Sequence, residues 1–142
     1  MNKPKRILKN VCEKHFESCL SQNDFQKAGV HILADFWFGK IIEDKEEIRK
    51  ILIEASKCSG STLLKTGIHK FYPQGITGFA LLAESHIALH SWPEMYYLSI
   101  DIFTCGGNVD PYKAFQYLKE KFQPQKIEFK EVVRGNVENL KQ

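Results

Sequence analysis

The sequence predicts an α+β protein, a two-layer sandwich in which a mainly antiparallel sheet carries two helices on one face. Strand-like segments recur between residues 30 and 133, and turns containing Gly or Pro separate them, as in hairpins. Two stretches in the same region show helical spacing near an N-capping aspartate. A chain of 142 residues can bury one core, so the helices are expected to cover the apolar face of the sheet.

The first strand is predicted over residues 30–38, which are rich in Ile, Leu, Phe and Trp, and Gly39 ends it. A helix is predicted over residues 43–58. Asp44 is its candidate N-cap, acidic residues lie in its first turn, and Ser59-Gly60 ends it. Apolar residues recur along this helix at helical spacing, so it is expected to present one apolar face to the sheet.

Two further strands are predicted over residues 61–72 and 76–83, with Pro73-Gln74-Gly75 as the turn between them. A second helix is predicted to start at Asp110-Pro111, because Asp is a good N-cap and Pro is favoured at the first helical position. Pro124 is expected to stop this helix, and residues 126–133 form the last predicted strand.

A polar and aromatic sheet face is predicted between residues 86 and 105. Residues 86–92 alternate in polarity, Pro93-Glu94 interrupts the pattern, and residues 95–105 alternate again. If Pro93-Glu94 turns a hairpin, the apolar residues of both strands share one face. The opposite face then collects His86, His90, Trp92, Asp101 and Cys105. This is not the composition of a core, so we expect an active site or a partner subunit there.

Residues 1–28 are predicted to be an N-terminal extension, partly an amphipathic helix, ahead of one domain at residues 29–142. No internal repeat, low-complexity tract or linker divides that domain. Cys12, Cys19 and Cys58 receive no role, and none of the four cysteines forms a CxxC pair, which argues against a zinc or redox motif.

The composition excludes several classes of protein. The net charge is +3 and the basic residues form no long block after residue 6, so nucleic acid is not an expected partner. No apolar run approaches the roughly 20 residues of a membrane span, and the N-terminus lacks the apolar segment of a secretion signal. A cytoplasmic protein with reduced thiols is therefore expected.

Three motifs point to one family. They are Glu84-Ser85-His86, His90-Ser91-Trp92-Pro93-Glu94 and Asp101-Ile102-Phe103-Thr104-Cys105-Gly106, and they closely resemble the small prokaryotic S-adenosylmethionine decarboxylase proenzymes. Upstream, His69-Lys70-Phe71, Pro73-Gln74-Gly75 and Gly78 fit the same pattern. The motifs lie in order and at matching spacing, and the resemblance extends from about residue 29 to residue 135.

The resemblance implies that the chain cleaves itself between Glu84 and Ser85. In this family the serine attacks the preceding carbonyl, β-elimination breaks the resulting ester, and a covalent pyruvoyl group remains at position 85. That group holds the substrate as a Schiff base in place of pyridoxal phosphate, and no metal is implied. Serine chemistry here needs a proton shuttle, and His90 is the candidate because imidazole titrates near neutral pH. Residues 85 and 90 are an odd number apart, so a turn or bulge must re-aim Ser85.

Two further residues take catalytic roles from the resemblance. The family has a hydroxyl that assists processing in a Gly-x-Ser-Gly stretch, and Gly75-Ile76-Thr77-Gly78 matches it, with threonine in place of serine. Thr77 keeps the hydroxyl and adds a methyl group. Cys105 matches the family's proton donor in decarboxylation. A cysteine thiol has an ordinary pKa of about 8.5 and is mostly protonated at neutral pH, so it can donate.

Phe71, Trp92 and Glu94 are the expected substrate-binding residues. The aromatic rings can stack on adenine and attract a sulfonium, and the carboxylate can accept hydrogen bonds from ribose hydroxyls or attract the cation. His69 and His86 receive no catalytic role, and structural hydrogen bonds are expected for both.

The predicted function is a self-processing, pyruvoyl-dependent S-adenosylmethionine decarboxylase, whose product supplies aminopropyl groups for spermidine biosynthesis. The alternative is an arginine or ornithine decarboxylase on the same scaffold. A third hypothesis is a non-enzymatic relative that binds a partner, but Ser85, His90 and Cys105 together speak against it. The resemblance further implies a homodimer of processed αβ units with sites near the subunit borders.

Overall fold

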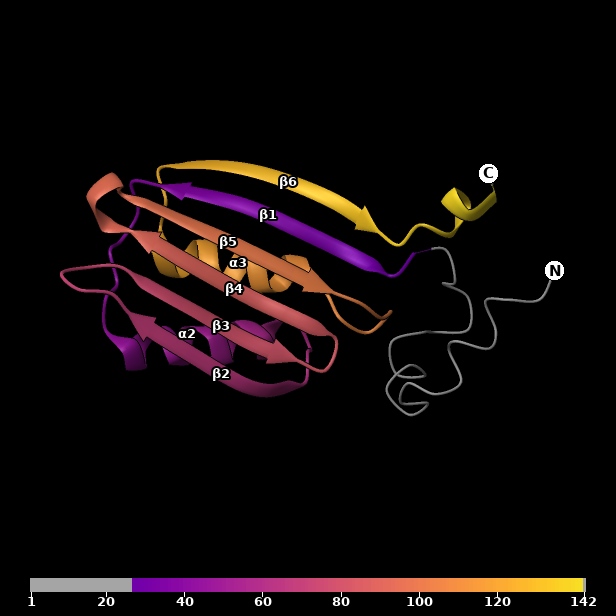
Figure 1. Cartoon of the computed structure of the whole chain (residues 1–142), viewed down its shortest axis with the longest axis horizontal. Coiled ribbons are helices and arrows are strands. Elements are labelled where there is room, and N and C mark those ends of the chain that lie inside the picture. Colours follow the sequence, from indigo (N-terminus) through magenta and orange to yellow (C-terminus); the bar gives the residue numbers. More distant parts are fainter. Residues whose placement is uncertain (1–26, 142) are drawn as a thin grey trace.

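The computed structural model describes residues 27–141 and contains one six-stranded antiparallel sheet in the order β2-β3-β4-β5-β1-β6. Helices α2 and α3 both lie behind this sheet in Figure 1, on one face. The predicted two-layer α+β sandwich is therefore confirmed. The elements are β1 (Gly29–Trp37), α2 (Lys45–Cys58), β2 (Leu63–Lys70), β3 (Ile76–Leu82), β4 (Ser85–Trp92), β5 (Tyr97–Thr104), α3 (Pro111–Phe122) and β6 (Lys126–Arg134), followed by a short 3-10 helix at Val137–Lys141.

The predicted hairpin at Pro93-Glu94 is confirmed as the connection between β4 and β5. A single 3-10 turn, Pro93–Met95, is followed by Tyr96 in the left-handed conformation with φ of 52°. This turn pairs Trp92 with Tyr97 and carries the register back to Ser85, which pairs with Thr104. On the helix-covered face the two strands bury Ile87, Leu89, Ile100 and Ile102.

Both helices begin at the predicted capping residues. The Asp44 carboxylate accepts a hydrogen bond from the Glu47 backbone N–H at 2.8 Å, and the Asp110 carboxylate accepts one from the Tyr112 backbone N–H at 2.9 Å. Such a cap contributes about 1 kcal/mol of stability. Helix α3 ends at Phe122 because Gln123 adopts the left-handed conformation, one residue before Pro124.

The core lies between the helices and the sheet, and Gly78 sets how closely they approach. A Cβ at Gly78 would lie 3.1–3.2 Å from the side chains of Ile48, Leu52 and Ile68. Helix α2 therefore packs directly on the backbone of β3. The fully buried side chains of this core include Ile32, Phe36, Ile48, Leu52, Ile87, Leu89, Ile102 and Leu118, and each stabilises the fold by roughly 1.5–3 kcal/mol.

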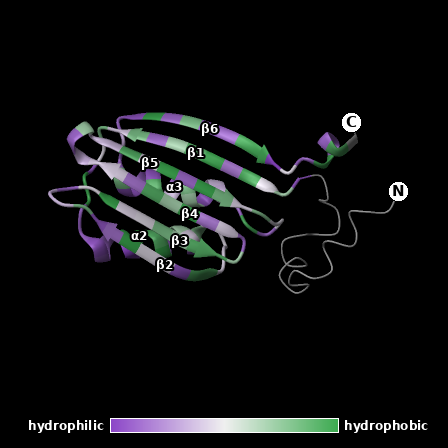
Figure 2. Ribbon diagram, in the orientation of Figure 1, coloured by the Kyte–Doolittle hydropathy of each residue, from purple (hydrophilic) through white to green (hydrophobic). Residues whose placement is uncertain are grey.

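The second face of the sheet is not covered by any helix, and we call it the open face. In Figure 2 hydrophilic and hydrophobic residues follow one another in bands along the strands, as expected when one face is buried and the other is not. The register places His86, His90, Trp92 and Asp101 together on the open face, as predicted. Among its apolar side chains, Phe79 and Leu81 remain 40% and 43% exposed.

The predicted extension falls almost entirely at residues 1–26, outside the described residues, and so do Cys12 and Cys19. Cys58 is described and lies exposed at the end of α2. Within residues 27–141, neither helix has the length and apolar character needed to cross a membrane.

Candidate active site

The predicted site residues gather at the two ends of strand β4, which lie at opposite ends of the sheet in Figure 1. Ser85 is the first residue of β4, and His90 is five residues further along it. At ~3.3 Å per residue their backbones are about 16 Å apart. We call the first group, Glu84, Ser85, His86 and Cys105, the serine end. We call the second group, Phe71, Thr77, His90, Trp92 and Glu94, the pocket end.

The carbonyl of Glu84 is held by two donors at the serine end. Its oxygen accepts hydrogen bonds from the Cys105 backbone N–H at 3.3 Å and from the Cys105 thiol at 3.2 Å. The Glu84 carboxylate accepts two more, from the backbone N–H and the hydroxyl of Thr62 at 2.9 and 3.0 Å. The peptide bond between Glu84 and Ser85 is thus fixed, and its carbonyl is polarised as in an oxyanion hole.

Ser85 has an unusual backbone conformation, with φ of 153°. Its hydroxyl oxygen lies 3.3 Å from His86 Nδ1. In a regular strand the side chains of neighbouring residues point to opposite faces, so the positive φ turns the Ser85 side chain toward that of His86. The sequence predicted such a re-aiming, and it places Ser85 beside His86.

A chain of polar contacts runs from His86 across the open face to β6. Asp101 lies between two histidines: its carboxylate is hydrogen-bonded to His31 Nε2 and stands 3.8 Å from His86 Nε2. Arg134 completes the chain with a hydrogen bond of 3.1 Å to His31 Nδ1. The Phe103 ring packs beside both histidines, with ring centroids 5.3 and 6.1 Å apart.

The pocket end lines an open cavity of about 320 Å³. That is the size of a small-ligand site. Within it the Thr77 hydroxyl and His90 Nδ1 lie 3.0 Å apart, and the Gln74 amide donates to the Glu94 carboxylate at 3.2 Å. The cavity is lined by Phe71, Gln74, Gly75, Thr77, His90, Ser91, Trp92 and Glu94, so all five residues of the pocket end contribute.

Trp92 is held by a stack of aromatic rings on the open face. Its ring lies 5.2 Å from that of Tyr97, which in turn stacks on Trp37 at 4.5 Å. The Tyr97 hydroxyl donates to the Asp35 carboxylate at 2.5 Å. Burial and this carboxylate together raise the pKa of Tyr97 to about 12, so the phenol keeps its proton at neutral pH. The stack supports one side of the Trp92 ring, and Trp92 remains 40% exposed and lines the cavity.

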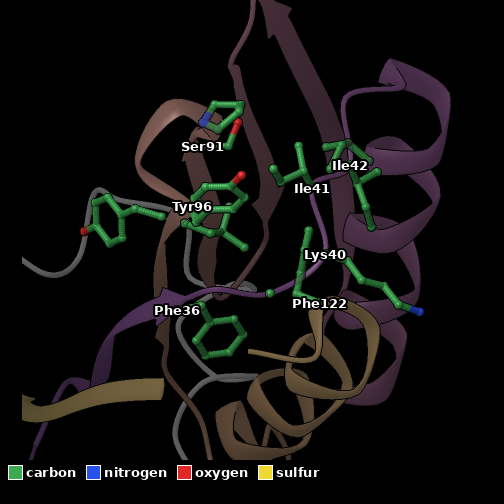
Figure 3. A pocket seen from close by; sticks show the side chains of 12 residues that line it. Phe36, Lys40, Ile41, Ile42, Ser91, Tyr96 and Phe122 are labelled. Carbon is green, nitrogen blue, oxygen red and sulfur yellow. The ribbon is translucent and has the colours of Figure 1, made fainter. Parts of the chain in front are cut away.

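A further cavity lies on the helix side of the sheet, where Phe36, Ile42, Tyr96 and Phe122 converge (Figure 3). Its volume is about 30 Å³. This is enough for ordered water and far too small for a nucleoside. Of these two cavities, the pocket end alone is large enough for a substrate.

Comparison with known proteins gives the same family as the motifs. The family model for S-adenosylmethionine decarboxylase matches residues 30–135, which is most of the chain. The chain belongs to the S-adenosylmethionine decarboxylase family. An S-adenosylmethionine decarboxylase proenzyme of Methanococcus maripaludis (strain C5) is 39% identical over 115 residues, covering 80% of this chain and 94% of the relative. One of Thermosipho melanesiensis is 40% identical over 114 residues, covering 79% and 88%.

A solved structure of the family has the same fold. The crystal structure of the adenosylmethionine decarboxylase from Aquifex aeolicus matches with a TM-score of 0.71 and 36% sequence identity, covering 78% of this chain and 92% of that one. At this identity and coverage, the two chains share the overall scaffold as well as the family.

Sequence reasoning predicted that His86, His90, Trp92 and Asp101 share one face, as the register has them, but it missed the neighbours of Ser85. His86 received no role, yet its ring contacts the Ser85 hydroxyl. His31 and Arg134 were not considered as site residues. A signal for His31 exists in the sequence: residues 31, 33, 35 and 37 alternate with the buried Ile32, Ala34 and Phe36, so His31 lies on the uncovered face of β1.

Proposed function

We propose that the protein is a self-processing S-adenosylmethionine decarboxylase that cuts its own chain between Glu84 and Ser85. One observation carries the proposal. The Glu84 carbonyl accepts hydrogen bonds from the backbone N–H and the thiol of Cys105, and the next residue, Ser85, carries the hydroxyl and begins β4. A carbonyl held in this way stabilises the negative charge that develops when a hydroxyl attacks it. Membership of the decarboxylase family supports this reading over a binding module.

Position 85 fits the pyruvoyl group of the family. The group requires a serine whose preceding carbonyl is activated, and Ser85 meets this requirement. When formed, a pyruvoyl group supplies an electron sink for the carbanion left by decarboxylation. Cys105 lies next to residue 85, at the Glu84 carbonyl, and donates a proton to the α-carbon of the substrate after CO2 has left. A thiol is mostly protonated at neutral pH and is therefore suited to this donation.

We propose that a second copy of the chain completes each site. His90 and Thr77, which are hydrogen-bonded to each other, lie too far along the sheet to reach Ser85 of their own chain. A two-fold dimer that pairs the open faces, with its axis running across the strands, uses the same surface of both copies and brings the serine end of one copy to the pocket end of the other. It also covers Phe79 and Leu81. In this arrangement His90 removes the α-proton of residue 85 during elimination, and Thr77 orients the His90 ring.

We propose S-adenosylmethionine as the substrate because of the pocket end. Adenine needs flat apolar surfaces, and Phe71 and Trp92 line the same cavity. The ribose hydroxyls need an acceptor, and the Glu94 carboxylate lies in that cavity too. Arginine and ornithine require neither, so the relatives' names and the cavity favour the same substrate.

The test combines intact mass with a substrate panel. Purified wild-type protein is expected to contain two chains, residues 1–84 and 85–142, the second starting with a pyruvoyl group. The variant Ser85→Ala is expected to stay one chain and to release no CO2 from carboxyl-labelled S-adenosylmethionine. A wild-type protein that remains one unmodified chain and is still active would contradict self-processing. Release of CO2 from arginine or ornithine, with none from S-adenosylmethionine, would contradict the substrate.

A further inference from the structure

We propose that His86 is the base that takes the proton from the Ser85 hydroxyl in the first step of self-cleavage, and that Asp101, His31 and Arg134 position it. This inference rests on the proposed function, since it assigns a step of that reaction. It separates the formation of the ester, which one chain performs, from the later elimination, for which His90 of the second copy is proposed. The Ser85 hydroxyl lies 3.3 Å from His86 Nδ1, whereas His90 is at the other end of β4.

Arg134 determines which nitrogen of His31 carries the proton. A guanidinium can only donate, and it faces His31 Nδ1 at 3.1 Å, so this nitrogen is the acceptor. The proton of neutral His31 is therefore on Nε2, where it is donated to the Asp101 carboxylate. With His31 as a donor on one side, the Asp101 carboxylate has a second partner on its other side.

His86 is that second partner. Its Nε2 lies 3.8 Å from the Asp101 carboxylate, and its side chain is 39% exposed. An Nε2–H directed at the carboxylate leaves Nδ1 unprotonated, and Nδ1 is the atom nearest the Ser85 hydroxyl. Asp101, His86 and Ser85 then form the acid–base–nucleophile arrangement that activates hydroxyls in acyl transfer.

The step balances without any outside reagent. The Ser85 oxygen forms a bond to the Glu84 carbonyl carbon while His86 Nδ1 takes its proton. The N–H and thiol of Cys105 hold the resulting oxyanion. The bond from that carbon to the Ser85 nitrogen then breaks, and His86 returns the proton to the nitrogen. The products are an ester between Glu84 and Ser85, a free amine on residue 85 and a neutral His86.

The same three side chains, His31, His86 and Asp101, lie close enough together to suggest a metal site. Two observations argue for the proton relay instead. The Arg134 guanidinium already brings a positive charge to His31, and His31 Nε2 is already hydrogen-bonded to Asp101. A cation would have to displace that bond and sit beside the guanidinium.

Charged groups lie on one side of His86 and an apolar side chain on the other. Asp101 on β5 faces His86. His31 on β1 and Arg134 on β6 lie on the far side of the Asp101 carboxylate. On β3 the neighbour of His86 is the apolar Leu81. The Cys105 thiol contacts the Glu84 carbonyl, one residue before Ser85. Asp101→Asn removes the acceptor that orients the His86 ring, so it is expected to slow cleavage.

The experiment follows cleavage of the freshly translated full-length chain with time. His86→Ala is expected to slow cleavage about 100-fold, as for loss of a general base, and added imidazole is expected to restore part of the rate. His69→Ala is the control, because His69 is also a histidine of the sheet, although a more exposed one, and contacts Phe71 rather than Ser85. It is expected to cleave at the wild-type rate.

Hydroxylamine, which cuts esters under conditions that spare peptide bonds, identifies the step. His90→Ala is expected to accumulate the ester, and hydroxylamine then releases a chain that starts at Ser85. From the double variant His86→Ala/His90→Ala, hydroxylamine is expected to release at least roughly tenfold less of this chain.

Three outcomes would overturn the role of His86: wild-type cleavage in His86→Ala, accumulation of the ester in that variant, or wild-type cleavage in Asp101→Asn. Failure of the wild-type chain to cleave would instead refute the proposed function. A requirement for added Zn²⁺ or Mg²⁺, abolished by chelator, would replace the proton relay by a metal site.

Discussion

The two ends of strand β4 differ in how completely one chain builds them. At the serine end the polar groups have partners within the chain: the Glu84 carbonyl binds Cys105, the Ser85 hydroxyl meets His86, and His86 faces Asp101. At the pocket end Phe71 is 49% exposed and Trp92 is 40% exposed, around an open cavity. This difference supports the proposed division, in which one chain activates its own Glu84–Ser85 bond and a second copy supplies the groups for elimination and substrate binding.

The sharpest test of this division is complementation between two inactive variants. Ser85→Ala and His90→Ala are each expected to form no pyruvoyl group alone. When they are co-expressed, a mixed dimer contains one site with Ser85 from one chain and His90 from the other, so about a quarter of the wild-type sites are expected to be active after random pairing. The measurement is the mass of the chain starting at residue 85 together with CO2 release. Absence of any cleavage in mixed dimers would place both residues' functions within one chain.

Cys105→Ala tests whether one residue serves both reactions at the serine end. The variant keeps the backbone N–H to the Glu84 carbonyl and loses the thiol, so cleavage is expected to continue at a reduced rate. Decarboxylation by the processed variant is expected to fall about 10²–10⁴-fold, because the acid for the substrate carbon is gone. Single-turnover CO2 release by fully processed protein measures this. Near-normal turnover would remove Cys105 from the decarboxylation step.

Glu94→Gln affects the pocket end alone. It removes the charge near the proposed ribose or sulfonium site while keeping the shape of the side chain, so KM for S-adenosylmethionine is expected to rise roughly tenfold, as for one lost charge-assisted hydrogen bond. Self-cleavage is expected at the wild-type rate, since Glu94 lies in the cavity and not at the Glu84–Ser85 bond. Slowed cleavage in this variant would mean that the two ends are not separable.

Tyr97→Phe gives the smallest expected effect and concerns the support of Trp92. The ring stack is kept, but Asp35 loses its phenol donor, which is expected to cost about 1 kcal/mol of unfolding free energy at neutral pH. In the wild-type protein the pKa of Tyr97 is raised from 10.0 to about 12. Between these values the unfolded chain loses the proton first, so wild-type stability falls as pH rises through this window. The stability difference from Tyr97→Phe, measured by urea unfolding, is expected to shrink over the same range.

Much of the serine end was predictable from local pattern. The alternation over residues 86–105 predicts the shared face, and the turn length sets the register: once Trp92 pairs with Tyr97, counting back pairs Ser85 with Thr104. Cys105 must then lie beside Glu84. The capping residues of both helices were equally local signals, because each acts on backbone groups within three residues.

The proton relay was not predictable, because it depends on pairing between distant strands. His31 reaches Asp101, 70 residues away, through the pairing of β1 with β5, and Arg134 reaches His31 through the pairing of β1 with β6. The sequence contains no turn that fixes either pairing. His86 was missed for a different reason. Regular strand geometry puts adjacent side chains on opposite faces, and the positive φ of Ser85 breaks that rule.

The position of β1 in the sheet has a consequence for the chain once it is cut. Residues 1–84 carry β1, β2 and β3, and residues 85–142 carry β4, β5 and β6. Because β1 lies between β5 and β6, and β3 pairs with β4, the two pieces are interleaved through three ladders of main-chain hydrogen bonds. The severed molecule therefore stays assembled without a covalent link. After unfolding, two separate polypeptides must associate again, so the yield of refolding depends on protein concentration. The uncut chain folds without this requirement, so the fold forms most readily before cleavage.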